Sequence, residues 1–166
     1  ADAVCAISSN HAASVPAPLA GEAYNYKWSI SNGSTITSSD QTRQITWSAG
    51  SVTSVTVSVT VSNATGCSVS STAHVIVRPP PVAVITVPMS VCANTTNNTA
   101  RAQDAGASAI YAWSIVGGTI SRGQGTTNIT WTAGTNNLVV LTLSVASASG
   151  CPVSTSSVVS VSCIVL

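Results

Sequence analysis

The sequence predicts an all-β protein built from two tandem β-sandwich domains, each of about 85 residues. β-branched residues dominate the chain, and no window shows the 3.6-residue apolar period of an amphipathic helix. The chain also repeats itself. Residues 26–30 return as residues 111–115, and residues 45–50 return as residues 129–134, in the same order. A repeat of this length is the size of a small independent domain.

Three consecutive prolines, Pro79, Pro80 and Pro81, divide the two repeats. Proline has no backbone N–H and fixes its own φ, so this run is a stiff linker that cannot belong to a central strand. We therefore expect the first sandwich to occupy residues 1–78, the linker residues 79–81 and the second sandwich residues 82–166.

The first sandwich begins with irregular segments and then becomes regular. Residues 1–10 form a short extended entry, and residues 11–22 hold Pro16 and Pro18, which restrict them to an edge or irregular strand. Residues 26–30 place Tyr, Trp and Ile on one face by their period of two, as in a half-buried strand. Short strands at residues 35–37 and 43–47 then surround a Ser/Asp loop.

The clearest strand of the first sandwich covers residues 55–61, where four valines alternate with Thr and Ser. This alternation is typical of a strand with one buried and one solvated face. After a turn at residues 63–66, residues 70–77 return the chain, with Val75 and Val77 facing inward.

The second sandwich repeats this plan. Its expected strands cover residues 111–115, 119–121, 128–131, 139–145 and 157–165. One further strand, at residues 82–87, has no counterpart in the first sandwich, because Cys5 matches Cys92 and the equivalent positions would precede Ala1. A sandwich without an edge strand exposes unpaired backbone groups and an apolar groove.

The chain has very little charge. Lys and Arg number 5, Asp and Glu number 4, and together they make 5% of the residues, against roughly 25% in an ordinary soluble domain. A net charge of +1 offers no basic patch for phosphates, which argues against nucleic acid as a partner. No apolar run approaches the ~20 residues of a membrane-spanning helix, so we expect no membrane insertion. A near-neutral surface lacks the repulsion that keeps copies apart, which favours an assembled or sugar-bearing surface.

Five cysteines in a chain with so little charge indicate an oxidising compartment. Cys5 and Cys67 flank the first repeat as Cys92 and Cys151 flank the second, so pairing within each repeat is the simplest connectivity. Each bridge would close a loop of roughly 60 residues and stabilise the fold by roughly 4 kcal/mol. Cys163 is left over. Zinc binding fails on spacing, since there is no Cys-x-x-Cys pair or Cys/His cluster.

The sequence contains no recognisable catalytic arrangement. No two carboxylates are placed together for acid–base work, and His11 and His74 lack any nucleophile motif. We therefore expect no catalytic residues, no metal site and no cofactor, and we expect that the protein is not an enzyme.

The four tryptophans fall into two classes. Trp28 and Trp113 share the apolar face of their strands and are expected in the core. Trp47 and Trp131 precede Ala-Gly turns near strand ends, where packing over the end of the sandwich is the first interpretation. Partial exposure with contact to a glycan is the alternative interpretation for these two side chains.

The repeated order is Cys, Tyr-x-Trp-x-Ile, Gly, Ile-Thr-Trp-x-Ala-Gly, a Val-rich strand, Gly-Cys and a closing Val-x-Val. It resembles the PKD-like or Ig-like repeats of bacterial secreted and cell-surface proteins, of the kind found in Bacteroidota. The resemblance implies an extracellular structural or adhesive role, in stalks, spacers or adhesive arrays. The acidic clusters with which some such modules bind calcium are absent, because the chain has only Asp2, Glu22, Asp40 and Asp104.

The leading hypothesis is therefore a secreted or cell-surface structural protein that self-associates as part of a fibre, stalk or adhesin array. The alternative is a polysaccharide-binding module that uses Trp47 and Trp131.

The C-terminal residues Cys163, Ile164, Val165 and Leu166 carry a further expectation about assembly. They stand where the first repeat continues into its proline linker, and they replace the prolines with an apolar segment. One hypothesis is that this segment of one copy completes the first sandwich of the next, head to tail, with Cys163 free to lock the junction. The other is that the chain is a piece of a longer array.

Overall fold

A computed structural model describes residues 3–18, 22–148 and 150–162, and within these residues it contains only strands, turns and loops. The chain divides into two compact units, Ala1–Pro79 (unit 1) and Pro80–Leu166 (unit 2). Each unit is a pair of β-sheets around its own apolar core, so the predicted all-β fold with two tandem sandwiches is confirmed.

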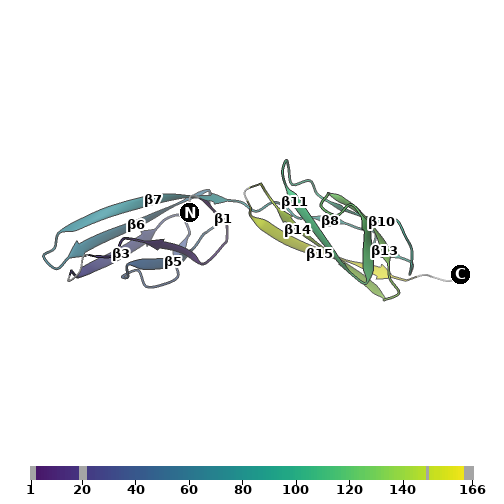
Figure 1. Cartoon of the computed structure of the whole chain (residues 1–166), viewed down its shortest axis with the longest axis horizontal. Coiled ribbons are helices and arrows are strands. Elements are labelled where there is room, and N and C mark those ends of the chain that lie inside the picture. Colours follow the sequence, from purple (N-terminus) through teal and green to yellow (C-terminus); the bar gives the residue numbers. More distant parts are fainter. Residues whose placement is uncertain (1–2, 19–21, 149, 163–166) are drawn as a thin grey trace. The chain divides into compact units, whose positions relative to one another are not determined.

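The described residues of unit 1 form seven strands in two sheets, with the orders β1-β7-β6-β3 and β2-β5-β4 (Figure 1). Its strands are β1 (Ala3–Cys5), β2 (His11–Ser14), β3 (Tyr24–Ile30), β4 (Thr35–Ile36), β5 (Gln44–Ser48), β6 (Ser54–Asn63) and β7 (Ser68–Arg78). The β6–β7 hairpin is the longest ladder of the unit, and β1 joins its far end in parallel.

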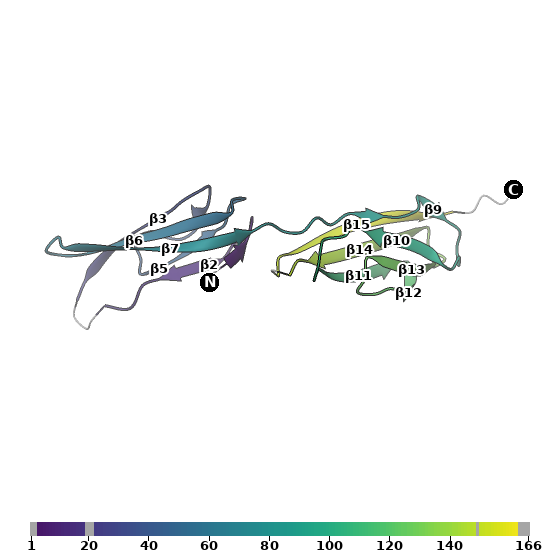
Figure 2. The ribbon, with the colours of Figure 1, turned by 90° about the horizontal axis from the view of Figure 1, so that it is seen from above.

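Unit 2 repeats these strands and adds one. Its sheets have the orders β9-β15-β14-β11 and β8-β10-β13-β12, and Figure 2 shows β9 beside β15. Its strands are β8 (Ile85–Thr86), β9 (Ser90–Val91), β10 (Asn98–Ala102), β11 (Ile110–Val116), β12 (Gly118–Arg122), β13 (Asn128–Ala133), β14 (Leu138–Ala146) and β15 (Pro152–Val161).

Several strand boundaries differ from those expected from the sequence, and β9 and β10 were not among the expected strands. β15 begins at Pro152 instead of residue 157, because its Ser/Thr-rich first half pairs with β14 along the whole hairpin. The strand expected at residues 82–87 is reduced to β8, since only Ile85 and Thr86 pair with β10. β2 ends at Ser14, two residues before Pro16.

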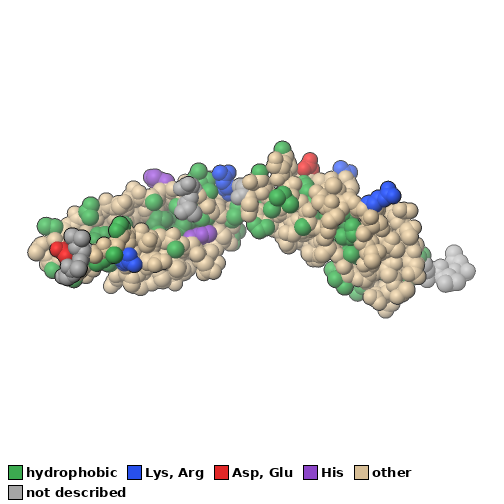
Figure 3. Space-filling view, viewed as in Figure 1, with side chains coloured by type: hydrophobic (Ala, Val, Ile, Leu, Met, Phe, Trp, Pro, Cys, Tyr) green, Lys and Arg blue, Asp and Glu red, His purple; other side chains and the backbone are tan. Residues whose placement is uncertain are grey.

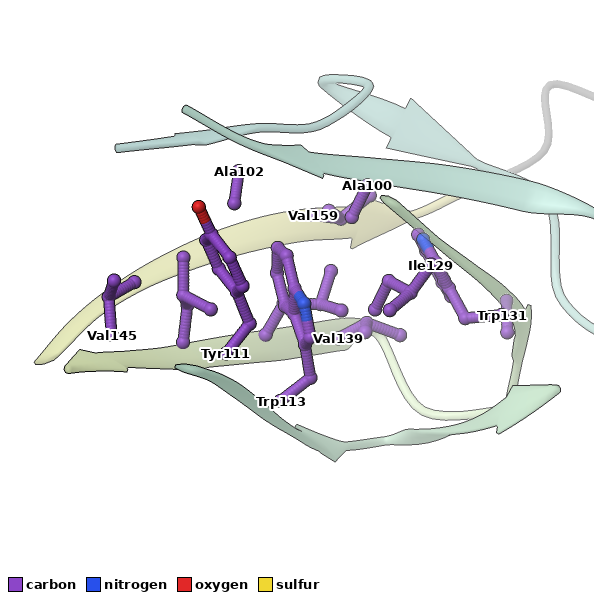
Figure 4. Packing of buried hydrophobic residues seen from close by; sticks show 12 residues of the cluster. Ala100, Ala102, Tyr111, Trp113, Ile129, Trp131, Val139, Val145 and Val159 are labelled. Atoms are coloured by element: carbon purple, nitrogen blue, oxygen red, sulfur yellow. The ribbon is translucent and has the colours of Figure 1, made fainter. Parts of the chain in front are cut away.

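The cores follow the predicted alternation. Every second residue of β6 and β14 points between the sheets, and Figure 4 shows the rings of Tyr111 and Trp113 lying between the two layers of unit 2. Trp28 and Trp113 are buried, which confirms their assignment to the core. Each indole also holds a loop, since its Nε1 donates a hydrogen bond to a backbone carbonyl oxygen, that of Thr42 at 2.8 Å or of Thr126 at 2.9 Å.

The repeated Ala-Gly that follows the second tryptophan has a steric cause. A Cβ on Gly134 would lie 2.6 Å from the carbonyl oxygen of Gly117, and a Cβ on Gly50 would lie 2.7 Å from that of Gly33. The backbone N–H of Gly134 uses this approach to donate a hydrogen bond to Gly117, at 2.8 Å. Glycine is therefore required here because two backbone segments of the unit come into close contact. The repeated Ala-Gly motif thus has a structural role.

Candidate functional site

The two units differ most at one sheet edge. In unit 2, β8 covers the edge of β10, with Thr86 opposite Arg101 and Ile85 opposite Ala102. In unit 1, β2 occupies the place of β10, because His11 faces Trp47 as Asn98 faces Trp131. β2 is nevertheless an edge strand of the described sheet β2-β5-β4. Ser14 and Val15 are the counterparts of Arg101 and Ala102, which pair with β8 in unit 2. In the described part of unit 1, no strand pairs with Ser14 and Val15 on that side.

The segment around β8 also covers the core of unit 2. Ala83, Ile85 and Val87 pack against that core, and the inward-facing residues of β15 are half-buried as a result: Val153, Thr155 and Ser157. Their counterparts on β7 are exposed: Val69, Ser71 and Ala73. The side chain of Val69 is 69% exposed although it points toward the interior of the sandwich. The inner face of unit 1 is thus open along β7.

Two hollows occupy this open face and define what we call the unit 1 groove. The first has a volume of about 400 Å³ and is lined by Val15, Pro16, Ala17, Pro18, Tyr24, Tyr26, Val59, Val61, Val69, Ser70 and Ser71. The second has a volume of about 440 Å³ and is lined by Val4, residues 11–15, Trp28, Trp47, Val57, Val59 and residues 71–75. Because they share Val15, Val59 and Ser71, the hollows lie end to end between β2 and β7.

The groove lining carries no Asp, Glu, Lys or Arg. Its two histidines are tied to hydroxyl groups: His11 Nε2 lies 2.7 Å from Ser8 Oγ, and His74 Nδ1 lies 3.1 Å from Thr56 Oγ1. At the rim, the Tyr24 hydroxyl donates a hydrogen bond to the Glu22 carboxylate at 2.7 Å, which raises the pKa of Tyr24 above its ordinary 10.0. The first hollow is lined mainly by apolar side chains, and the second by a mixture of apolar, hydroxyl and histidine side chains, so the groove favours an uncharged occupant.

The backbone of β2 offers hydrogen bonds at the same edge. Val15 donates its N–H to the carbonyl oxygen of Arg43 at 3.1 Å, so Val15 faces β5. Since bonding directions alternate along an antiparallel strand, the N–H and C=O groups of Ser14 face the open side. In unit 2, Gln103 donates its N–H to Val84 at 3.0 Å, whereas Pro16 stands at the equivalent position and has no N–H to donate.

The predicted disulfide between Cys5 and Cys67 is wrong. Cys5 lies beside Arg78 at the last residue of β7, while Cys67 precedes the first residue of that strand, roughly 33 Å away at the rise of a β-strand. A disulfide requires Cα atoms within about 7 Å of each other. Cys67 is a free, exposed thiol, and Cys5 is disulfide-bonded to another cysteine.

The predicted disulfide between Cys92 and Cys151 is wrong for the same reason. β9 ends at Val91 beside Val161, whereas Cys151 precedes the opposite end of β15, roughly 30 Å away. Both cysteines are disulfide-bonded, but they do not bond to each other. Residues that flank a repeat in the sequence lie at opposite ends of the folded unit, because one long strand separates them.

The predicted glycan contacts of Trp47 and Trp131 are also wrong. Their side chains are 2% and 0% exposed, so neither presents a ring face on which a sugar could stack. Trp47 packs instead against His11, with ring centroids 4.8 Å apart. The indole Nε1 of Trp131 is buried with no hydrogen-bond partner among the described residues. Packing over the end of the sandwich is therefore the role of both.

The remaining candidate residues are not brought into any catalytic arrangement. His11 and His74 both line the second hollow, without a carboxylate among the lining residues. The described residues contain no group of three His, Cys, Asp or Glu side chains that could hold a metal ion. No helix in the described ranges is long and apolar enough to cross a membrane. Cys163, Ile164, Val165 and Leu166 lie outside the described residues.

The inward-facing wall of the groove on β7 was not identified from the sequence. Val69, Ser71 and Ala73 continue the inward phase of Val75 and Val77, so a strict period of two over β7 marks them as inner positions. Tyr24 and Tyr26 mark the other wall by the same rule. Their exposure could not be predicted from this pattern, because it depends on the absence of a covering strand.

Solved structures resemble the chain weakly. The extracellular cadherin domains 3–6 of protocadherin gamma B2 share 11% identity, with 98% of this chain and 46% of that chain covered and a TM-score of 0.35. The ectodomain of human desmocollin-1 shares 12% identity, with 96% and 34% covered and a TM-score of 0.34. The Bacteroides ovatus protein SGBP-B, from a mixed-linkage glucan utilization locus and in complex with a heptasaccharide, shares 15% identity, with 96% and 42% covered and a TM-score of 0.35.

The chain spans less than half the length of each of these three solved chains, and at such TM-scores they support no inference about function. No curated protein matches the sequence significantly.

A family model described as PKD-like domain matches residues 1–75 and again residues 78–161. Domains of this kind are typically structural or adhesive modules without catalysis, and they are usually extracellular. The two matches cover nearly the whole chain and correspond to unit 1 and unit 2. The chain belongs to the PKD-like domain family, with one member in each unit.

Proposed function

We propose that the protein is a secreted structural subunit of a cell-surface fibre, stalk or adhesin array, and that it acts by assembly without catalysis. One observation carries this proposal: unit 2 holds a strand along its β10 edge, while the equivalent edge and inner face of unit 1 are open. An open edge strand beside an apolar groove is a template for a strand from another chain.

The proposed donor is the C-terminal segment of a second copy, Cys163 to Leu166. In an extended strand, Ile164 and Leu166 lie on one face, so two aliphatic side chains enter the groove together. Backbone hydrogen bonds to β2 supply affinity, and the side chains displace water from the hollows. Because the donor lies at one end of the chain and the acceptor in the other unit, the contact is head to tail and produces an open filament.

The surface supports close association of copies. The chain carries a net charge of +1, and Figure 3 shows few Lys, Arg, Asp or Glu side chains on the face in view. Neighbouring copies therefore repel each other little, and rows of uncharged Ser and Thr lie on the outer faces of β6 and of the first half of β7. Salt should accordingly have little influence on assembly, because few charges remain to be screened.

Deletion of Ile164, Val165 and Leu166 tests the proposal. The intact chain should sediment as fibres visible by electron microscopy, and the truncated chain should remain monomeric with an unchanged β-sheet circular dichroism spectrum. A matched control replaces the same three residues by Ser-Thr-Ser, which keeps the length and removes the apolar side chains. Fibres formed by the truncated chain, or an intact chain that never polymerises, would overturn the proposal.

A further inference from the structure

We infer that the unit 1 groove accepts its strand in one direction and one register. The strand lies antiparallel to β2 with its N-terminal end beside Pro16 and its C-terminal end beside His11. It pairs with the backbone at Ser14 and fills the two hollows with alternate aliphatic side chains. The inference rests on the proposed function in taking a second copy of this chain as the source of the strand.

The direction follows from the equivalence of the two units. β8 runs antiparallel to β10, with Ile85 opposite Ala102 and Thr86 opposite Arg101. Val15 and Ser14 hold these two positions in unit 1, because both β2 and β10 pair with the next strand in the same register. A strand that copies β8 therefore enters at the Pro16 end and runs toward His11.

The register follows from the hydrogen bonds that the edge can make. Ser14 has both an N–H and a C=O group on the open side, and it can exchange two bonds with one residue of the incoming strand. Pro16, at the position of Gln103, lacks the N–H that Gln103 donates to Val84. A strand shifted by two residues toward Pro16 would lose hydrogen bonds. A shift by one would turn its aliphatic face to the solvent.

The side-chain pattern follows from the hollows. Unit 2 fills the equivalent space with Ala83, Ile85 and Val87, which alternate along one segment. By register, the first two positions correspond to the hollow beside Val15 and Val69, and the third corresponds to the hollow beside Ala13 and Ala73. The required occupant is thus an uncharged strand with a small residue followed by two β-branched or aliphatic residues at alternate positions.

A synthetic peptide with the sequence of residues 82–89, Val-Ala-Val-Ile-Thr-Val-Pro-Met, is the direct probe. Added to the intact chain under conditions where it is monomeric, the peptide should slow hydrogen exchange of the Ser14 amide at least about tenfold. The amide of Val15 is already bonded to Arg43 and should change far less. A peptide of reversed sequence is the control for direction, and one with Asp at the positions of Ile85 and Val87 is the control for the hollows.

Two neighbouring residues of β7 provide a matched pair of variants. Both are exposed and both border the groove, but by the alternation of the strand the side chain of Ser71 faces the interior of the sandwich and that of Thr72 faces the outer side of the sheet. Ser71→Lys should weaken peptide binding at least about tenfold, because the ammonium group would be desolvated by the peptide. Thr72→Lys adds the same charge on the outer face and should change binding less than about twofold. Ser14→Pro should abolish binding, whereas Ser14→Ala should retain it.

The outcomes separate this inference from the proposed function. Binding of the peptide without fibres from the intact chain would support the groove specificity and reject head-to-tail assembly. If fibres form but the peptide neither binds the chain nor inhibits assembly, the proposal of fibre assembly stands and the proposal that the unit 1 groove binds a strand is rejected. Equal binding of the forward and reversed peptides, or equal effects of Ser71→Lys and Thr72→Lys, would overturn the stated direction and face.

Discussion

In their described residues, units 1 and 2 share seven strands in the same order, yet the core is closed in unit 2 and open along β7 in unit 1. The positions occupied by Val145 and Tyr111 in unit 2 are buried, while the corresponding Val61 and Tyr26 in unit 1 are half-buried. The difference comes from the segment of residues 83–87, in which only the two residues of β8 form regular strand. A short edge element thus controls the hydration of a whole sandwich face, because it covers side chains along the length of β15.

The loops over the first tryptophan of each unit show a second, smaller difference. In unit 2, the side-chain amide of Gln124 accepts a hydrogen bond from the N–H of Trp113 at 3.0 Å and donates one to its carbonyl at 2.6 Å. In unit 1, the backbone carbonyl of Asp40 accepts from the N–H of Trp28 at 3.0 Å. The backbone of the first tryptophan is therefore held by a side chain in unit 2 and by a main-chain carbonyl in unit 1. The two loops should respond differently to substitution for this reason.

The largest expected effect concerns the second tryptophan of each unit. Trp131→Ala should lower the free energy of unfolding of unit 2 by about 4 kcal/mol, since it leaves a cavity in a closed core. Trp47→Ala should lower that of unit 1 by about 2 kcal/mol, because the neighbouring hollow lets the site relax and admit water. Urea unfolding followed by circular dichroism measures both. Equal losses would contradict the difference in core closure.

The next comparison uses the cysteines that precede β7 and β15. Cys151→Ser should destabilise the protein by about 3 kcal/mol through loss of a disulfide. Cys67→Ser should change the free energy of unfolding by less than about 0.5 kcal/mol, because that thiol is free and exposed. Thermal unfolding under non-reducing conditions provides the measurement, and reductant should remove the difference between wild type and Cys151→Ser. A strongly destabilised Cys67→Ser variant would show that this thiol has a partner.

Gln124→Ala should destabilise unit 2 by about 1–2 kcal/mol, because it leaves the backbone N–H and C=O of Trp113 without their partners. Gln41→Ala serves as the control in unit 1, where the side chain is exposed and the main chain holds the strand. The control should stay within about 0.5 kcal/mol of wild type. Hydrogen exchange at the Trp113 amide should report the loss directly, and an unchanged rate would refute the assigned role of Gln124.

The smallest expected effect concerns two equivalent valines. Val153→Ser should cost about 1 kcal/mol because Val153 is half-buried beneath the segment that includes β8. Val69→Ser should be nearly neutral in the monomer, since Val69 is mostly exposed. In fibre assembly Val69→Ser should have a clear effect, because it should raise the critical concentration for assembly. An unaltered critical concentration would argue that no strand covers Val69 in the fibre.

Much of this structure could be predicted because it is encoded locally. Alternating valines in β6 and the Tyr-x-Trp-x-Ile pattern of β3 specify strand and inner face within a few residues. The internal repeat then specifies two sandwiches, and the family match agrees with that division.

The tertiary structure alone decided which residues meet. Cys92 and Cys151 were expected to bond because they flank a repeat, yet β15 holds them at opposite ends of unit 2. For Trp47 and Trp131 the sequence left packing and partial exposure at strand ends as alternatives, and the tertiary structure buries both side chains. Val69 has the same inward phase as Val153 and differs only in what lies above it. Periodicity reports the direction of a side chain, whereas distance and exposure depend on strands paired from far along the sequence.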